Sequence, residues 1–245
     1  MSGHSKWNNI KNKKAKTDAQ KGKIFTKIGK EIAIAVREGG PDPNNNSKLR
    51  DLIAKAKSNN VPNDNIDRII KKASGAEAVA YEEITYEGYG PSGVAVIVEA
   101  ATDNRNRTAG EVRHYFDKFG GNLGQVGCVS FLFEKKGVIA ISALDEWGDR
   151  VVDSDKLMEE ALEAGAADFV EEDNVFEIYC EPDDLAAVAD ELTAKGYTFI
   201  SSEVEKVPSN YVTLENEDDI KFMNLLIENL EENEDIVNVW HNWEE

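Results

Sequence analysis

The sequence has only two cysteines, Cys128 and Cys180, which lie far apart in the chain. They form neither a CxxC metal clip nor a disulfide framework, and such sparse cysteine is typical of a reducing compartment. No run of about 18 apolar residues occurs, which excludes a membrane-spanning helix. No apolar stretch follows the first lysines, so no secretory signal is expected. These absences predict a cytoplasmic protein with no membrane partner.

Positive charge is also scarce, because 28 Lys and Arg face 47 Asp and Glu, for a formal net charge of −19. The two signs of charge are distributed unevenly along the chain. Residues 1–75 carry 17 Lys and Arg against 7 Asp and Glu, a net charge of +10, whereas residues 76–245 carry 11 against 40, a net charge of −29. This segregation indicates a basic region with a polyanionic partner. A fortuitously basic helical domain is the alternative interpretation.

Signatures of catalysis and of metal binding are missing. The three histidines, His4, His114 and His241, lie at no metal-ligand spacing with each other or with a cysteine. Neither a GxSxG nucleophile elbow nor a DxDxDG calcium loop is present. Residues 88–93 match G-x-G-x-x-G, but a strand-like run follows them, so we expect a hairpin loop and not a dinucleotide site. The sequence therefore predicts a protein that is not an enzyme, with no catalytic residue, metal or cofactor.

Lysines dominate the first 16 residues, which contain too few apolar side chains to order themselves alone. A helical pattern follows over residues 18–38, with apolar residues on one face and basic residues on the opposite face. Lysines offer point charges to phosphates, while Trp7 either stacks on an unpaired base or packs onto the helical domain. The predicted nucleic-acid-binding residues are Lys6, Trp7, Lys11, Lys13, Lys14, Lys16, Lys23, Lys27, Lys30 and Arg37.

A second candidate contact lies in the acidic part of the chain, at the start of a helix predicted over residues 108–119. It consists of Asn104, Arg105, Asn106 and Arg107. One interpretation is structural: Asp103, Asn104 or Thr108 caps the helix, and the arginines pair with carboxylates. The other is functional, because arginines at a helix N-terminus oppose the helix dipole unless an anion such as phosphate is close. The sequence leaves both open.

The order of predicted elements indicates an α+β fold with several domains. Helices are expected over residues 18–38, 47–59 and 63–73, then strands over 84–87 and 94–99, the helix over 108–119 and a strand over 129–133. Strands over 137–142, 168–171, 175–179 and 197–205 alternate with helices over 155–164 and 183–195 in the β-α-β-β-α-β order of ferredoxin-like folds. A strand over 211–214, a helix over 218–232 and a strand over 237–243 complete the chain. We expect a basic helical domain (1–78), a discontinuous α/β domain (79–134 and 208–245) and an acidic ferredoxin-like insertion (135–207).

Several ordered segments together resemble one family. They are GHSKW (3–7), KKAK (13–16), KIFTK (23–27), GGPDPN (39–44), NVP (60–62), IDR (66–68), YEGYGP (86–91), TDNRNRT (102–108) and FGGNLG (119–124). The sequence resembles the YebC/PmpR family, which includes the mitochondrial translational activator of cytochrome oxidase subunit I. The resemblance implies a three-domain fold, a cytoplasmic location and no catalytic residues.

The same resemblance implies two functions. One is a probable transcriptional regulator that binds DNA; the other is a translation factor that binds ribosomal RNA and relieves stalling. The acidic part of the chain would repel a long duplex, which favours a confined site on the ribosome. The acidic domains are also a candidate surface for a protein partner.

Overall fold

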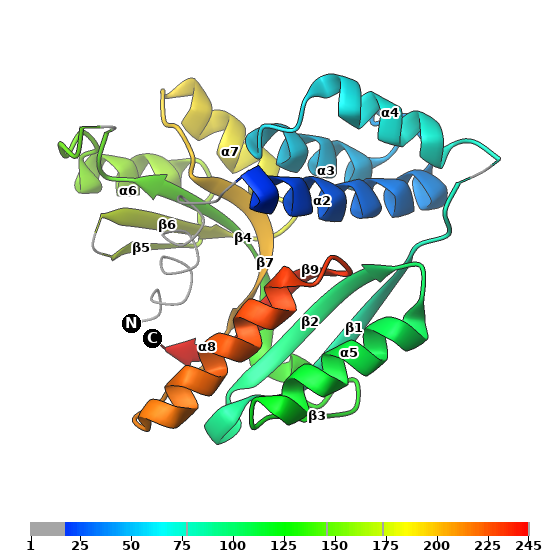
Figure 1. The fold of residues 1–245 in the computed structure, drawn as a ribbon. Coiled ribbons are helices and arrows are strands. Elements are labelled where there is room, and N and C mark those ends of the chain that lie inside the picture. Colours follow the sequence, from blue (N-terminus) through cyan, green and yellow to red (C-terminus); the bar gives the residue numbers. More distant parts are fainter. Residues whose placement is uncertain (1–17, 77, 146, 173, 245) are drawn as a thin grey trace. The chain divides into compact units, whose positions relative to one another are not determined.

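A computed structural model describes residues 18–244, except residues 77, 146 and 173. The chain divides into two compact units (Figure 1). Within the described residues, one unit runs from Phe133 to Tyr211, and the other joins the chain up to Leu132 with residues 212–244. The predicted fold class is confirmed: an α+β protein with an N-terminal three-helix domain, a discontinuous α/β domain and an inserted ferredoxin-like domain.

Among its described residues, the N-terminal domain has three helices, α2 (Asp18–Gly39), α3 (Ser47–Ser58) and α4 (Asn63–Ala73). Their apolar faces meet in one core that includes Ile32 and Leu49, both fully buried. Asn46 fixes the turn between α2 and α3: its Oδ1 accepts a hydrogen bond from the backbone N–H of Leu49 at 3.0 Å, and its Nδ2 donates to the carbonyl of Ala35 at 2.8 Å. The cap therefore satisfies both a helix start and a neighbouring carbonyl.

The α/β domain is built from segments at both ends of the chain. Its elements are β1 (Glu82–Tyr89), η1 (Pro91–Gly93), β2 (Ala95–Thr102), α5 (Arg105–Lys118), β3 (Asn122–Leu123), η2 (Ser130–Leu132), β8 (Val212–Thr213), α8 (Glu217–Glu232), β9 (Ile236–His241) and β10 (Trp243–Glu244). An antiparallel sheet has the order β3-β1-β2-β9, and β8 pairs with β10 in parallel. Alternate residues of β2 pack with α5 and α8 in one core, so both helices cover one face of this sheet (Figure 1).

Residues 88–93 close the hairpin between β1 and β2, as predicted: Gly88 and Tyr89 are the last residues of β1, and the turn follows them. Their glycines serve packing and turning. A Cβ on Gly88 would lie 2.5 Å from the carbonyl oxygen of Asn122, so only glycine lets β3 approach β1 this closely. Gly93 has a φ of +82°, which a residue with a side chain rarely adopts.

The segment before the inserted unit differs from the prediction. The strand expected over residues 129–133 is wrong: η2 occupies Ser130–Leu132, and the strand starts only at Phe133. Glu87, which is 3% exposed, explains the difference. Its carboxylate accepts hydrogen bonds from the N–H groups of Gly127, Val129 and Ser130 at 2.8–2.9 Å, so these donors are not available to a sheet.

Replacing Glu87 with glutamine is expected to lower the free energy of unfolding by about 2 kcal/mol, because an amide turns a donor towards backbone donors that then lose their acceptor. Burial alone would raise the pKa of Glu87, but the three N–H groups outweigh it and lower that pKa. Hydrogen exchange at Gly127, Val129 and Ser130 should accelerate. Glu82→Gln, at an exposed position of the same strand, is the control; equal protection in both variants would contradict this role of Glu87.

In the part of the inserted unit that the structure describes, there are one four-stranded sheet and two helices. Its elements are β4 (Phe133–Ser142), α6 (Ser154–Glu163), β5 (Asp168–Glu172), β6 (Val175–Cys180), α7 (Leu185–Ala194) and β7 (Ser201–Pro208). The antiparallel strand order β5-β6-β4-β7 is that of a ferredoxin-like fold. One face of the sheet, with Ile139 and Ile178, packs against α6 and α7. No helix among the described residues is long and apolar enough to cross a membrane.

Candidate nucleic-acid interface

Six of the predicted nucleic-acid-binding residues lie outside the described residues. They are Lys6, Trp7, Lys11, Lys13, Lys14 and Lys16. The other four belong to α2, where Lys23 is half-buried and Arg37 is exposed. Lys27 and Lys30 have partners within the protein, so α2 does not present all four predicted basic residues as one open face.

Lys27 and Lys30 join α2 to the α/β domain. Lys27 Nζ donates to the carbonyl of Glu231, in the last turn of α8. Lys30 Nζ donates to the carbonyl of Glu234 at 3.0 Å and forms an ion pair with Asp235 at 2.6 Å. The C-terminus of a helix attracts cations because its last carbonyls point outward. The Lys30 side chain is 11% exposed, so its amine is held inside the protein by these two partners.

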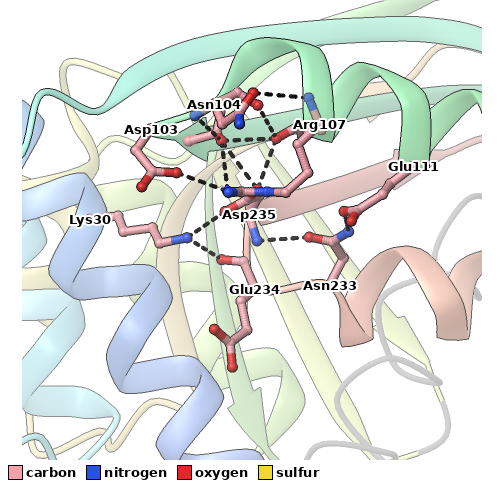
Figure 2. Close-up of polar contacts among 10 residues, drawn as sticks. Lys30, Asp103, Asn104, Arg107, Glu111, Asn233, Glu234 and Asp235 are labelled. Carbon is pink, nitrogen blue, oxygen red and sulfur yellow. Dashed lines mark hydrogen bonds and ion pairs between the residues drawn. The ribbon is translucent and has the colours of Figure 1, made fainter.

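Asp235 is the centre of the cluster in Figure 2 and is 4% exposed. Arg107 approaches Asp235 Oδ2 from α5, with Nη2 at 2.6 Å and Nε at 3.2 Å. The hydroxyls of Thr102 and Thr108 lie 3.1 and 2.8 Å from the same oxygen. Burial alone would raise the pKa of Asp235, but hydrogen bonds from Lys30, Arg107 and Thr108 lower it to about 2. The cluster therefore ties α2 and α5 to one ionised carboxylate.

The second candidate contact, residues 104–107, separates into two pairs. Asn104 Oδ1 accepts from the N–H of Arg107 at 3.1 Å and caps α5, which starts three residues earlier than predicted. Arg107 also pairs with Asp103 at 2.9 Å, and its pKa is raised by the hydrogen bonds to Asp235 and Asp103. All four residues are exposed, so the two pairs differ in their contacts and not in their burial. The carboxylates that the structural interpretation required are thus present for Arg107.

The two arginines are therefore expected to respond differently to substitution. Arg107→Ala removes a partner from a buried carboxylate and should lower the melting temperature by a few degrees. Arg105→Ala should leave the melting temperature unchanged and, if the functional interpretation of this contact holds, weaken nucleic-acid binding. Thermal unfolding and fluorescence anisotropy with a labelled RNA separate the two effects. Equal destabilisation by both substitutions would show that Arg105 is also structural.

A cavity of about 370 Å³ opens between α2, α4 and the chain entering β1. Its walls include the side chains of Phe25, Ala33, Ile69, Val79 and Tyr81, with Asn65, Arg68 and Lys72 also lining it. The Lys30 amine lies 5.6 Å from the centroid of the Tyr81 ring, a cation–π contact that fixes this wall.

Arg68 and Lys72 are exposed, as is Lys71 beside them. None of these three residues was among the predicted nucleic-acid-binding residues. Basic residues at positions i, i+3 and i+4 of the predicted helix over 63–73 were the available signal, since they share one helix face. The described residues contain no group of three or more His, Cys, Asp or Glu side chains able to hold a metal ion.

Comparisons with known proteins cover nearly the whole chain. A family model described as the TACO1/YebC protein N-terminal domain matches residues 5–76, and one described as the TACO1/YebC second and third domain matches residues 81–243. A probable transcriptional regulatory protein of Acetivibrio thermocellus is 62% identical over 244 residues, 99% of each chain. One of Ruminiclostridium cellulolyticum is 60% identical, over 100% of this chain and 97% of that relative.

Similarity extends to solved structures. The crystal structure of a conserved hypothetical protein from Aquifex aeolicus matches with a TM-score of 0.83 and 44% identity. The match covers 94% of this chain and 93% of that chain.

Proposed function

The chain belongs to the TACO1/YebC family, and on that basis we propose that it is a non-enzymatic, nucleic-acid-binding regulator of gene expression. Its curated relatives are named as probable transcriptional regulatory proteins, not as enzymes. The observation that carries the proposal is the concentration of positive charge in residues 1–75, with a net charge of +10 beside −29 in the rest of the chain. A cationic surface on an acidic protein favours a polyanion at that surface.

Two cationic elements supply the proposed interface. The first is the lysine-rich N-terminal segment, residues 6–16. The second is the exposed edge of α4, with Arg68, Lys71 and Lys72 beside the cavity. Phosphates bind the cations, while the apolar cavity with Phe25 and Tyr81 offers a place for an unstacked base. This combination suits single-stranded nucleic acid better than an uninterrupted duplex.

A confined RNA site on the ribosome is the second candidate target. The specific observation in its favour is the division of the basic face of α2. Lys27 and Lys30 are held by the C-terminal end of α8 and by Asp235, so this helix does not present a continuous basic face to a DNA groove. The strongly acidic remainder of the chain also repels a duplex that extends beyond a small contact.

The deciding experiment compares co-sedimentation with ribosomes against binding of labelled single-stranded RNA, random duplex DNA and promoter DNA, all at the same salt concentration. Co-sedimentation with ribosomes and no preference for duplex would support the ribosomal target. Tight binding to promoter DNA alone would support transcriptional regulation. Absence of binding to all four would overturn the proposed function.

The α4 edge is tested by replacing Arg68, Lys71 and Lys72 with alanine. We expect affinity for single-stranded RNA to fall about tenfold or more, and the slope of log K against log salt to decrease by about 0.7 for each lost contact. Replacing Lys118, Lys156 and Lys221, three exposed lysines outside the helical domain, removes the same charge and serves as the control. An equal loss in both variants would show that net charge acts and that the α4 edge does not.

A further inference from the structure

The sheet of the inserted unit has a second face, opposite α6 and α7, and this face is strongly acidic. Strand register and alternation place its charged residues. They are Glu134 and Lys136 on β4, Asp168 and Glu172 on β5, Glu177 on β6, and Glu203 and Glu205 on β7. Among the paired positions of this face, carboxylates therefore outnumber the amine six to one.

The centre of this acidic face is buried. Val138, Ala140 and Val175 are at most 1% exposed although they alternate with the residues that pack on the helices, and Glu177 is 2% exposed. The Tyr179 hydroxyl donates to Glu177, and burial together with that carboxylate raises the pKa of Tyr179. The face thus combines an apolar centre with carboxylates around it, and a segment that is cationic and partly apolar complements such a surface.

We propose that the acidic face binds the lysine-rich N-terminal segment of the same chain, residues 6–16, and competes with nucleic acid for it. Residues 1–17 contain five lysines and no Asp or Glu, together with Trp7 and Ile10 to meet the apolar centre. Residues 76–245, by contrast, contain only 11 Lys and Arg, so positive charge is much denser in the N-terminal segment. An extended segment of 17 residues spans up to about 55 Å, so its tether to α2 allows a wide reach.

Docking makes the acidic face an intramolecular competitor that opposes nucleic-acid phosphates for the N-terminal lysines. The N-terminal lysines pair with carboxylates of the acidic face until a nucleic acid offers them a denser array of negative charge. Because the two partners share one chain, the acidic face acts at an effective concentration on the order of millimolar. Weak and non-specific nucleic acids are then excluded. The competition rests on the proposed function, whereas the docking of the segment does not.

Docking is tested on the unaltered full-length chain by carbodiimide coupling, which joins a lysine amine to a nearby carboxylate as an amide. A mixture of ¹⁴N and ¹⁵N protein identifies links within one chain by mass spectrometry. We expect Lys11, Lys13, Lys14 and Lys16 to couple within one chain to Glu203, Glu205 or Asp168. Coupling mainly to Asp155 and Glu159, exposed carboxylates on α6, or without preference, would overturn the proposal.

Competition is tested with two variants that remove the same charge. Glu203→Gln with Glu205→Gln alters the acidic face, and Asp155→Asn with Glu159→Gln alters α6. At low salt, the first should bind single-stranded RNA about fivefold more tightly than the unaltered chain, and the second less than twofold more tightly. Deleting residues 1–17 should abolish the difference. Equal gains would overturn the competition, whereas absence of RNA binding with intact cross-links would reject the nucleic-acid function and retain the docking.

Discussion

Replacing Asp235 with asparagine is expected to lower the free energy of unfolding by about 3 kcal/mol, because Lys30 and Arg107 would face a neutral amide in a largely buried site. Loss of the carboxylate costs more at Lys30 than at Arg107, because the Lys30 side chain is 11% exposed and cannot easily regain water, whereas that of Arg107 is 43% exposed. Urea unfolding followed by tryptophan fluorescence would report the change, since Trp240 and Trp243 belong to the same domain as Asp235. Glu228→Gln, at an exposed position on α8, is the matched control.

The pH dependence gives a second measurement of the same cluster. The pKa of Asp235 is lowered to about 2 from an ordinary 3.8, so its stabilisation is present above about pH 4 and is lost as pH falls towards 2. Asp235→Asn should remove that loss. Burial lowers the pKa of His241 to about 4 from 6.5, so His241 destabilises the fold between pH 6.5 and 4 in both proteins. An unchanged acid limb below pH 4 in the variant would contradict the role of Asp235.

Neutralising Lys11, Lys13, Lys14 and Lys16 together should reduce nucleic-acid affinity by two to three orders of magnitude at about 0.1 M salt. The reason is counterion release: each lost phosphate contact flattens the slope of log K against log salt by about 0.7–0.9, so four contacts account for a slope of roughly three. Anisotropy titrations of single-stranded RNA at four or five salt concentrations give both the affinity and the slope.

The control for the lysine variant is a set of four exposed lysines elsewhere, Lys118, Lys135, Lys156 and Lys221. Replacing them changes the net charge equally, so it isolates the position of the charge from its amount. We expect a less than threefold change in affinity and a nearly unchanged slope. If the salt slope of the N-terminal variant equalled that of the unaltered chain, the proposed role of the N-terminal lysines would be wrong.

Most helices and strands could be predicted because their signals are local. The apolar period and the Gly39-Gly40 end of α2 lie within the helix and the residues that follow it, and the start and end of α4 agree with the prediction. The prediction failed where a distant residue intervened. Glu87 takes the N–H groups of Val129 and Ser130, which lie more than 40 positions away in the chain, and a strand-like run becomes a turn.

The candidate site was predictable in composition and not in its pairings. Periodicity identified Lys27 and Lys30 as one basic face of a helix, but Lys30 meets Asp235 from a position 205 residues distant. Likewise, Arg107 lies 128 residues from the same carboxylate. No local pattern marks Asp235, because it follows α8 among several other acidic residues. The cavity beside Arg68 and Lys72 likewise could not be predicted from local patterns, because it forms only where α2 packs against α4.

The amino-acid sequence by itself determined the α+β class, the separation of positive from negative charge and the order of the helices and strands. Each of these follows from composition, periodicity and turn chemistry, which act over a few residues. Tertiary structure alone decided which cations are available to a ligand. An ion pair forms only where folding brings the two side chains within a few ångströms and excludes water, and so Lys30 and Arg107 hold a carboxylate while Arg68 and Lys72 stay exposed.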